Sequence, residues 1–183
     1  MEYREFRAED SPALKQMLSK LENTFTELDE EYRNFDSTSA QEYLGDITND
    51  TDKMNGEIFL AFKDGEAIGF IQGVIIEKNN PQYHPCREGW IGLLFVEEKY
   101  RSQNIGKTLM NKMCNYFHTK DCNYVKLFCS SHNTNAIDFY QKYGFKISNL
   151  ELKFHLSEKE NDYHKNSQTK SANNATRSTW KSF

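Results

Sequence analysis

The chain has 183 residues, which is enough for one domain with a sizeable hydrophobic core. Hydrophobic residues make up 37% of it and aromatic residues 14%, and the mean hydropathy is -0.83. A formal net charge of -4 and a pI near 5.8 argue against nucleic acid as a partner, which requires a basic surface. Because we find neither a leader-like segment nor an apolar run long enough for a membrane span, we expect a cytoplasmic protein without membrane partners.

The four cysteines show no pattern of a metal site or a disulfide framework. They are Cys86, Cys114, Cys122 and Cys129, and none forms a Cys-x-x-Cys pair. This usage is typical of reduced, mostly buried thiols. We therefore expect no bound metal.

The first part of the chain predicts a strand followed by a helix. Residues 2–6 are strand-like, and Ser11 followed by Pro12 is typical of an N-cap and the first helical position. Apolar residues then recur at the i, i+3, i+4, i+7 spacing of a helix with one buried face. These residues are Leu14, Met17, Leu18 and Leu21.

A second helix and a hairpin follow. Residues 37–47 are expected to be helical after an acidic connection. Residues 57–63 and 67–76 read as apolar strands on either side of Asp64-Gly65, a strong signal for a two-residue hairpin turn.

The segment from Gly89 to Lys107 predicts an anion site. An apolar strand over 89–96 leads through the turn 101–106 into a helix that begins near Lys107. The first turn of a helix leaves amides without partners and carries a partial positive charge. A phosphate fits such a site, whereas an ordinary strand–turn–helix connection is the alternative interpretation.

The remaining elements are two helices and two strands. Leu109, Met110, Met113 and Phe117 form the expected inner face of the helix after the turn. Residues 124–129 alternate like a strand, and a fourth helix with Ala136, Phe139, Tyr140 and Tyr143 on one face should end at Gly144. Residues 145–156 are expected to form a last strand or strand pair, and the polar segment from Ser157 on is expected to be a tail.

Two motifs in this order resemble the GNAT N-acetyltransferase superfamily. The turn from Arg101 to Gly106 is similar to its pyrophosphate-binding motif, Arg/Gln-x-x-Gly-x-Gly/Ala, with Asn104 in place of the first glycine. Asn tolerates positive φ better than other non-glycine residues, so we predict a positive φ at Asn104. Residues 133–145 resemble the family signature Asn-x-x-Ala-x-x-Leu/Phe-Tyr-x-x-x-Gly-Phe.

The resemblance implies the fold and the domain organisation. The expected class is α/β (α+β), with a single GNAT domain over residues 1–156 and a polar tail over 157–183. Its mixed central sheet would contain a splayed strand pair and be flanked by about four helices. A homodimer is a candidate arrangement, because the tail could dock on a second copy.

The resemblance also implies acetyl-CoA as cosubstrate. The turn would hold the pyrophosphate through backbone amides, the preceding strand would pair with the pantetheine arm, and Asn133 would cap its helix and contact that arm. The expected cofactor-binding residues are Leu94, Phe95, Val96, Arg101, Ser102, Gln103, Asn104, Ile105, Gly106, Lys107, Thr108, Asn133 and Tyr140.

Two residues are candidates for proton transfer. Tyr140 is the expected general acid for the leaving thiolate, because a phenol stays protonated at neutral pH. The alternative is that Tyr140 belongs only to the core. Glu88 is the expected general base by its position in the family's fourth strand, with a solvated strand-end charge or an ordered water chain as alternatives. A covalent route through Cys129 ranks low, because no paired histidine is evident.

The acceptor is expected to be a small-molecule amine attacked directly, without an acyl-enzyme. Acidic residues between the first two helices would suit a cation, although a plain solvated loop is the alternative. The candidates are Glu27, Asp29 and Glu30. Other possibilities are acetylation of a protein N-terminus or lysine, a non-catalytic CoA-binding regulatory module, and a protein that binds a partner through its tail.

Overall fold

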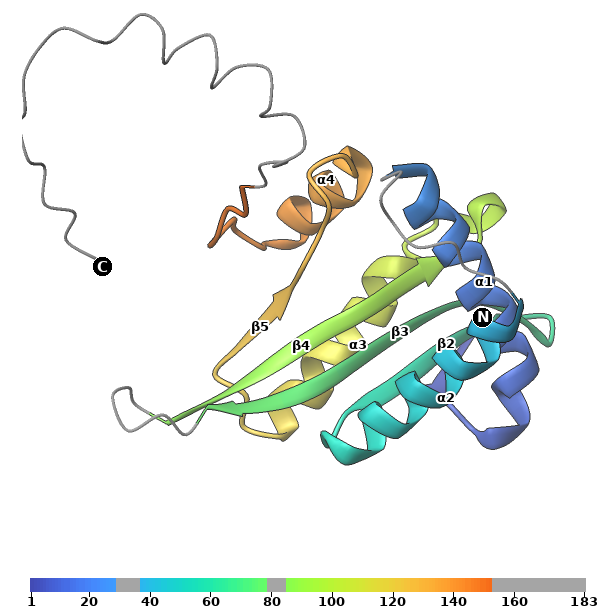
Figure 1. The fold of residues 1–183 in the computed structure, drawn as a ribbon, viewed down its shortest axis with the longest axis horizontal. Coiled ribbons are helices and arrows are strands. Elements are labelled where there is room, and N and C mark those ends of the chain that lie inside the picture. Colours follow the sequence, from blue (N-terminus) through green and yellow to red (C-terminus); the bar gives the residue numbers. More distant parts are fainter. Residues whose placement is uncertain (29–36, 79–84, 153–183) are drawn as a thin grey trace, which may run out of the picture. The chain divides into compact units, whose positions relative to one another are not determined.

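The computed structural model describes residues 1–28, 37–78 and 85–152, without the side chains of residues 27, 28 and 37–41. Residues Met1–Phe145 form one compact unit, and a second unit begins at Lys146. The candidate site lies entirely within the first unit, which is shown as a ribbon in Figure 1.

A five-stranded mixed sheet forms the centre of this unit (Figure 1). Its strands are β1 (Glu2–Glu5), β2 (Glu57–Lys63), β3 (Glu66–Lys78), β4 (Cys86–Val96) and β5 (Tyr124–Leu127), in the spatial order β1-β2-β3-β4-β5. Neighbouring strands from β1 to β4 are antiparallel, and β5 is parallel to β4. The predicted mixed sheet is confirmed.

Two hydrophobic cores lie on opposite faces of the sheet. On one face, α1 (Ser11–Leu28) and α2 (Ser37–Lys53) cover side chains of β2, β3 and β4. On the other face, α3 (Ile105–Thr119) buries a full stripe against the sheet, and α4 (Thr134–Tyr143) packs aromatic side chains on the same core. The predicted inner faces of α1 and α3 are confirmed, since all eight of their apolar residues are buried.

The β2–β3 hairpin has the predicted turn. Asp64 and Gly65 both have positive φ, 52° and 83°, as a type I′ turn requires. At the other end of the chain, Gly144 (φ 123°) ends α4 as predicted, and its amide donates to the carbonyls of Tyr140 and Gln141.

Several predicted boundaries are wrong. Strand β3 covers Glu66–Lys78 rather than 67–76, and β4 begins at Cys86 rather than at 89. Ser11 does not cap α1: it is helical, and its hydroxyl donates to the carbonyl of Ala8 at 2.8 Å. A short 3₁₀ helix, Ala8–Asp10, precedes it. Helix α2 continues to Lys53 rather than 47, and the hydroxyls of Thr48 and Thr51 bond to carbonyls of the preceding turn. The strand β5 ends at Leu127 rather than 129.

The predicted last strand is also absent from the described part of the segment concerned. Residues 145–152 carry no helix or strand, although Ile147, Leu150 and Leu152 are exposed apolar side chains. Local alternation of apolar residues predicts a strand only where a partner strand accepts its hydrogen bonds, and none does so here. Residues 153–156 and the tail lie outside the described residues.

Strand β4 contains a bulge at Gly92. The register with β3 shifts between Gln72 and Gly73, which face Leu93 and Ile91. A Cβ added to Gly92 would lie 2.3 Å from the Oε1 atom of Gln72, whose Nε2 donates to Thr51 of α2 at 3.0 Å. A larger residue at this position would therefore displace the Gln72 amide from its place in the bulge.

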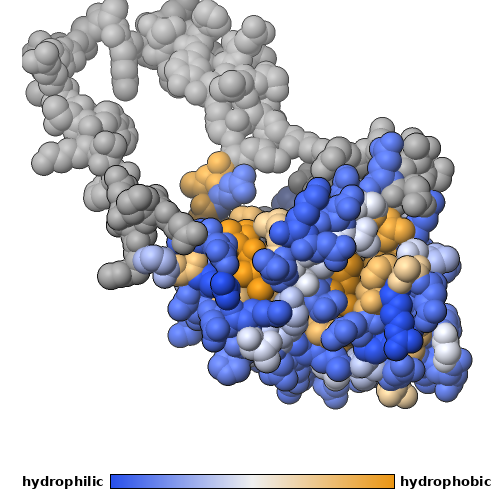
Figure 2. Space-filling model, turned by 90° about the horizontal axis from the view of Figure 1, so that it is seen from below, coloured by the Kyte–Doolittle hydropathy of each residue, from blue (hydrophilic) through white to orange (hydrophobic). Residues whose placement is uncertain are grey.

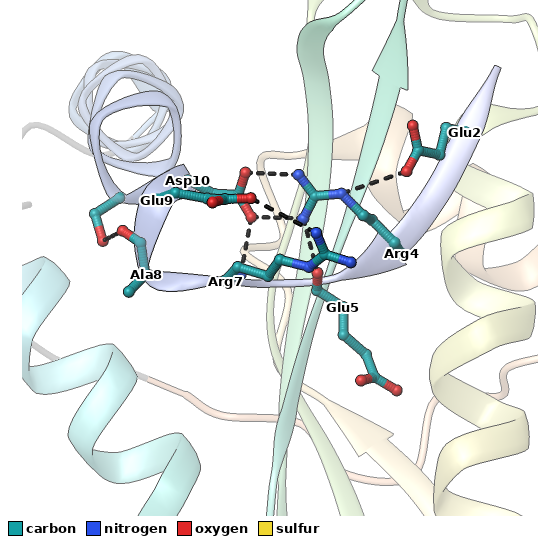
Figure 3. A network of polar contacts seen from close by, with 8 residues as sticks. Glu2, Arg4, Glu5, Arg7, Ala8, Glu9 and Asp10 are labelled. Atoms are coloured by element: carbon teal, nitrogen blue, oxygen red, sulfur yellow. Dashed lines mark hydrogen bonds and ion pairs between the residues drawn. The ribbon is translucent and has the colours of Figure 1, made fainter.

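Asp10 connects β1 to the start of α1 (Figure 3). Its carboxylate accepts two hydrogen bonds from the guanidinium of Arg4, at 2.7 and 2.8 Å, and one from the backbone amide of Arg7 at 2.8 Å. The side-chain bond from Arg4 is the main reason why the pKa of Asp10 is lowered, and it outweighs the effect of burial.

The surface is mainly hydrophilic on the face shown in Figure 2, with hydrophobic residues gathered in a few patches. None of the helices within the described ranges has the length and apolar character required to cross a membrane.

We predict that Asp10→Asn lowers the free energy of unfolding by about 2 kcal/mol at pH 7, because it removes a charged hydrogen-bond acceptor. The lowered pKa means that this contribution is present above the ordinary pKa of the carboxyl, 3.8, and is lost as the pH falls through the folded value. Urea unfolding at pH 7 and at pH 3 measures both effects. Glu9→Gln is the matched control, because Glu9 is 70% exposed and pairs with Arg7 at 3.6 Å; an equal loss in both variants would contradict the prediction.

Candidate functional site

The site begins where β4 and β5 separate. The two parallel strands pair from Glu88–Tyr124 to Ile91–Leu127, and no pairing continues beyond that point in the described chain. The last residues of β4, Leu93 to Val96, are paired with β3 alone. Alternate backbone groups of this segment therefore face an open edge, ready to bond an extended ligand.

The turn after β4 ends in a left-handed residue. Asn104 is the N-cap of α3 with φ 62° and ψ 9°, which confirms the predicted positive φ. Ser102 also has a φ of 62°. The amide of Thr108 bonds to the carbonyl of Asn104, so the amides of the three residues before it have no acceptor within the helix.

Side chains of the turn donate hydrogen bonds to nearby backbone carbonyls and so stabilise its conformation. Arg101 Nε donates to the carbonyl of Val96 at 3.1 Å, and Thr108 Oγ1 donates to the carbonyl of Asn104 at 3.0 Å. Gln103 Nε2 donates to the carbonyl of Lys99 at 3.3 Å. Ser102 and Lys107 are exposed.

Other residues expected to bind the cofactor are part of the cores. Ile105 and Phe95 are buried, at 1% and 6% exposure, and Leu94 and Val96 pack on the core below α3. Ile105 and Phe95 therefore have only their backbone groups left for a ligand, whereas Leu94 and Val96 are partly exposed. The amide of Gly106 lies at the first turn of the helix, where a Cβ would make ordinary contact with Phe139. The binding roles remain predictions.

Asn133 is the N-cap of α4, and Tyr140 of that helix packs on the same core as α3. The predicted cap is confirmed: Asn133 Oδ1 accepts a hydrogen bond from the amide of Ala136 at 3.1 Å. Tyr140 packs edge-on against Phe139 and Phe145. Burial, followed by the neighbouring Cys129 thiol, raises the pKa of Tyr140 to about 12. The phenol therefore holds its proton at neutral pH.

The side chain of Glu88 is completely buried under neighbouring side chains of the sheet. It is 0% exposed, and its carboxylate accepts hydrogen bonds from Tyr124, from Trp90 Nε1 at 3.0 Å and from Lys126 Nζ at 3.1 Å. Lys78 Nζ lies 2.9 Å from the same oxygen as Lys126. The alternative interpretation, a solvated charge at a strand end, is therefore wrong, because side chains from three strands enclose this group.

These contacts determine the charge of Glu88. Burial alone raises its pKa, but the hydrogen bonds from Tyr124, Lys78, Trp90 and Lys126 outweigh burial and lower it to about 2. Such a carboxylate is a weak base at neutral pH and has no open path to a substrate proton. The contacts therefore do not favour the predicted role as general base.

A cleft of about 220 Å³ opens beside the bulge of β4. It is lined by Tyr43, Ile47, Asp50 and Met54 of or just after α2, by Gln72 and Val74 of β3, and by Gly92 and Leu93 of β4. Sequence reasoning missed this cleft. The signal that was available is Gly92 inside an apolar strand, which is typical of a bulge or of a close approach.

An aromatic and basic surface next to this cleft was missed as well. Trp90 and Phe128 lie with their ring centroids 4.9 Å apart, and Phe128 is 82% exposed. Among the predicted acceptor residues, the side chain of Glu27 and the whole of Asp29 and Glu30 lie outside the described residues. No group of three or more His, Cys, Asp and Glu side chains suited to a metal occurs in the described ranges.

Comparison with known proteins identifies relatives of most of the first unit. A family model described as Acetyltransferase (GNAT) family matches residues 21–145. N-alpha-acetyltransferase 30 of Dictyostelium discoideum is 36% identical over 88 residues, which is 48% of this chain and 44% of that protein. Spermine/spermidine N(1)-acetyltransferase of Bacillus subtilis is 25% identical over 97 residues, 51% of this chain and 60% of that protein.

The fold is also similar to a solved acetyltransferase structure. The complex of AAC(6')-Iy with a bisubstrate analogue, CoA-S-monomethyl-acetylneamine, superposes with a TM-score of 0.66 at 16% identity, covering 84% of this chain and 96% of that one. This similarity shows the fold. The chain spans about half the length of the curated relatives that it matches.

We predict that Asn104→Val lowers the free energy of unfolding by about 1–2 kcal/mol, because a β-branched residue is strained at positive φ. Asn104→Gly is the matched control, since glycine adopts this conformation without strain, and it should leave stability unchanged or slightly raised. Urea unfolding of the three proteins measures the difference. Equal losses for Val and Gly would show that the side chain, rather than the backbone angle, matters here.

We predict that the protein loses about 3 kcal/mol of stability through Glu88 as the pH falls from 4.5 toward 2. The pKa is lowered in the folded state, so the contribution is complete above the unfolded value and disappears through the folded one. Glu88→Gln should remove this pH dependence and destabilise the protein at pH 7. Glu77→Gln, which removes the exposed ion pair with Arg87, should cost less than about 1 kcal/mol. Parallel pH profiles of wild type and Glu88→Gln would contradict the interpretation.

Proposed function

The chain belongs to the acetyltransferase (GNAT) family, and on this basis we propose that it transfers the acetyl group of acetyl-CoA to a primary amine. The observation that carries this proposal is the separation of β4 and β5, together with the start of α3 shortly after β4 in the chain. The end of β4 provides an open backbone edge, and the first turn of α3 provides amides that have no acceptor within the helix. The solved AAC(6')-Iy complex, whose ligand contains CoA, supports the same cosubstrate.

In this proposal the turn holds the negatively charged end of acetyl-CoA. The amides of Ile105, Gly106 and Lys107 donate to pyrophosphate oxygens, and the partial positive charge of the helix terminus favours them. Arg101 and the left-handed Asn104 keep the turn in shape. The open edge of Leu94–Val96 pairs with the amide groups of the pantetheine arm. Acetyl-CoA supplies the activated acetyl group.

Tyr140 acts as the general acid. The attacking nitrogen forms a C–N bond at the thioester carbonyl carbon, the C–S bond breaks, and the thiolate that leaves takes the proton of the Tyr140 hydroxyl. The nitrogen loses its extra proton to water as the amide forms, and the Tyr140 phenolate takes a proton back from water. Because the pKa of Tyr140 is about 12, its hydroxyl is protonated at neutral pH and can donate to the thiolate. Cys129, which lies beside Tyr140, has a pKa raised by burial and is a poor nucleophile at neutral pH, which favours direct transfer.

Water rather than Glu88 takes the proton of the acceptor ammonium in this proposal. The carboxylate is fully buried and is paired with two lysines, so an acceptor amine does not reach it. A water at the mouth of the cleft, near the exposed Asp50, relays the proton to solvent. Glu88 then acts through Trp90 and Lys126, which it holds in place.

A small primary amine is the first candidate for the acceptor. The cleft of about 220 Å³ admits a short amine-bearing chain but not a large rigid ligand. The α-amine at a peptide end is the second candidate, and the Dictyostelium relative named N-alpha-acetyltransferase 30 favours it. Either amine would extend from the cleft along the sheet surface.

We predict that Tyr140→Phe lowers kcat about 100-fold with little change in the affinity for CoA, because the variant retains the ring but loses the proton. Release of the CoA thiol in the presence of a panel of amines measures kcat, and calorimetry measures CoA binding. Tyr143→Phe is the matched control on the same helix, where the hydroxyl contacts Asn111 and Cys114 of α3. Absence of amine-dependent release by the wild type would instead support a non-catalytic CoA-binding module.

A further inference from the structure

The surface next to the cleft is basic although a carboxylate lies beneath it. We define the basic strip as Lys78, Trp90, Tyr124 and Lys126, the four residues that bond to Glu88. Lys78 is 49% exposed and Lys126 28%, whereas the carboxylate is fully covered. An ammonium has three donors, and one bond to Glu88 leaves donors of both lysines facing solvent.

The charges of the basic strip do not cancel. Two ammonium groups share one carboxylate, so this cluster has a net charge of about +1. The next charged residues along the two strands, Glu77 and Arg87, point to the opposite face by the alternation of a strand and pair with each other at 2.7 Å. The positive charge above Glu88 therefore remains available to a ligand.

The basic strip is continuous with the cleft. Val74 lines the cleft and pairs in register with Trp90, and Trp90 pairs in register with Lys126. Trp90 and the cleft residue Gly92 are two residues apart and share one face, about 7 Å from each other along the strand. Lys126 lies one strand further, about 5 Å across. The half-buried indole of Trp90, which donates to Glu88, lies between the cleft residue Gly92 and Lys126.

The two ends of this surface have opposite charge. Asp50 at the cleft is exposed and suits the ammonium of an acceptor before it loses its proton. Lys126 and Lys78 at the other end suit an acidic group and repel a second cation. A ligand that carries an amine and an acid separated by several bonds matches both ends.

We propose that the basic strip selects acceptor amines that carry a carboxylate, either on the same small molecule or on a neighbouring residue of a peptide. This inference rests on the proposed acetyl transfer. It disfavours polyamines, the cationic acceptors that the acidic segment between the first two helices suggests. Lys126 acts here as a specificity-determining residue and Glu88 as a positioning residue.

Two matched sets of acceptors test the proposal with the full chain and acetyl-CoA. The small-molecule set is δ-aminovalerate, pentylamine and cadaverine, which differ at the end remote from the amine. The peptide set consists of amidated tripeptides that differ only in a third residue of Glu, Gln or Lys. We expect kcat/KM to be about tenfold higher for the acidic member than for the neutral one in at least one set, and lowest for the cationic member. The set that shows the preference identifies the source of the acid.

Substitution then locates the preference. Lys126→Gln should lower the acidic-to-neutral ratio of kcat/KM about tenfold, and Lys78→Gln should lower it less. Lys112→Gln is the matched control, because Lys112 also lies over an aromatic ring, Phe59, but on α3 at the opposite face. The ratio is internal to each variant, so a partly unfolded preparation does not alter it. Raising the salt to about 0.5 M should reduce the ratio in the wild type.

The outcomes separate the two proposals. Turnover of all six acceptors at equal kcat/KM, or a ratio unchanged in Lys126→Gln, would overturn the selection of acidic acceptors and leave acetyl transfer intact. A preference for cadaverine or the Lys peptide would overturn it as well. Absence of turnover with every amine would overturn the proposed function, and the selection with it.

Discussion

One buried carboxylate joins the three strands on which the candidate site is built. Glu88 of β4 binds Lys78 of β3 and both Tyr124 and Lys126 of β5. The strand β5 has only four residues and one neighbour, so its backbone ladder alone holds it weakly. Burial of the Glu88 carboxylate costs free energy, and the hydrogen bonds and ion pairs from all of its partners together offset that cost. The point at which β4 and β5 separate depends on this cluster.

The first helix connects two parts of the unit that are distant in sequence. Asp10 fixes its start to β1 through Arg4, and Lys20 in its second half pairs with Glu97 at 2.6 Å. Glu97 directly follows β4, and its amide bonds to the carbonyl of Ile68 in β3. The segment that leads into the Asn104 turn is therefore anchored from the sheet and from α1, on the face opposite to α3. A turn held from both sides is preorganised for a ligand.

Local patterns were sufficient to predict most elements but not the polar contacts between them. The apolar spacing of α1 and α3, the Asp64-Gly65 turn and the positive φ of Asn104 follow from residue types close in sequence. The extension of α2 was missed because Thr48 and Thr51 resemble loop residues until their hydroxyls find carbonyls of the same helix.

The candidate site was predicted less completely, for a physical reason. The two lysines that contact Glu88, Lys78 and Lys126, are 10 and 38 residues away in the sequence, and no periodicity shows which lysine meets a given carboxylate.

The bulge at Gly92 reverses which residues of β4 face each side of the sheet. Before the bulge, the even-numbered residues face α1 and α2. After it, the odd-numbered residues Leu93 and Phe95 face these helices. Substitutions leave this parity intact, whereas loss of one residue between Glu88 and Leu93 exchanges the two faces of one segment. The spacing along β4, more than the identity of its apolar residues, is thus what keeps the basic strip and the cleft on a common face.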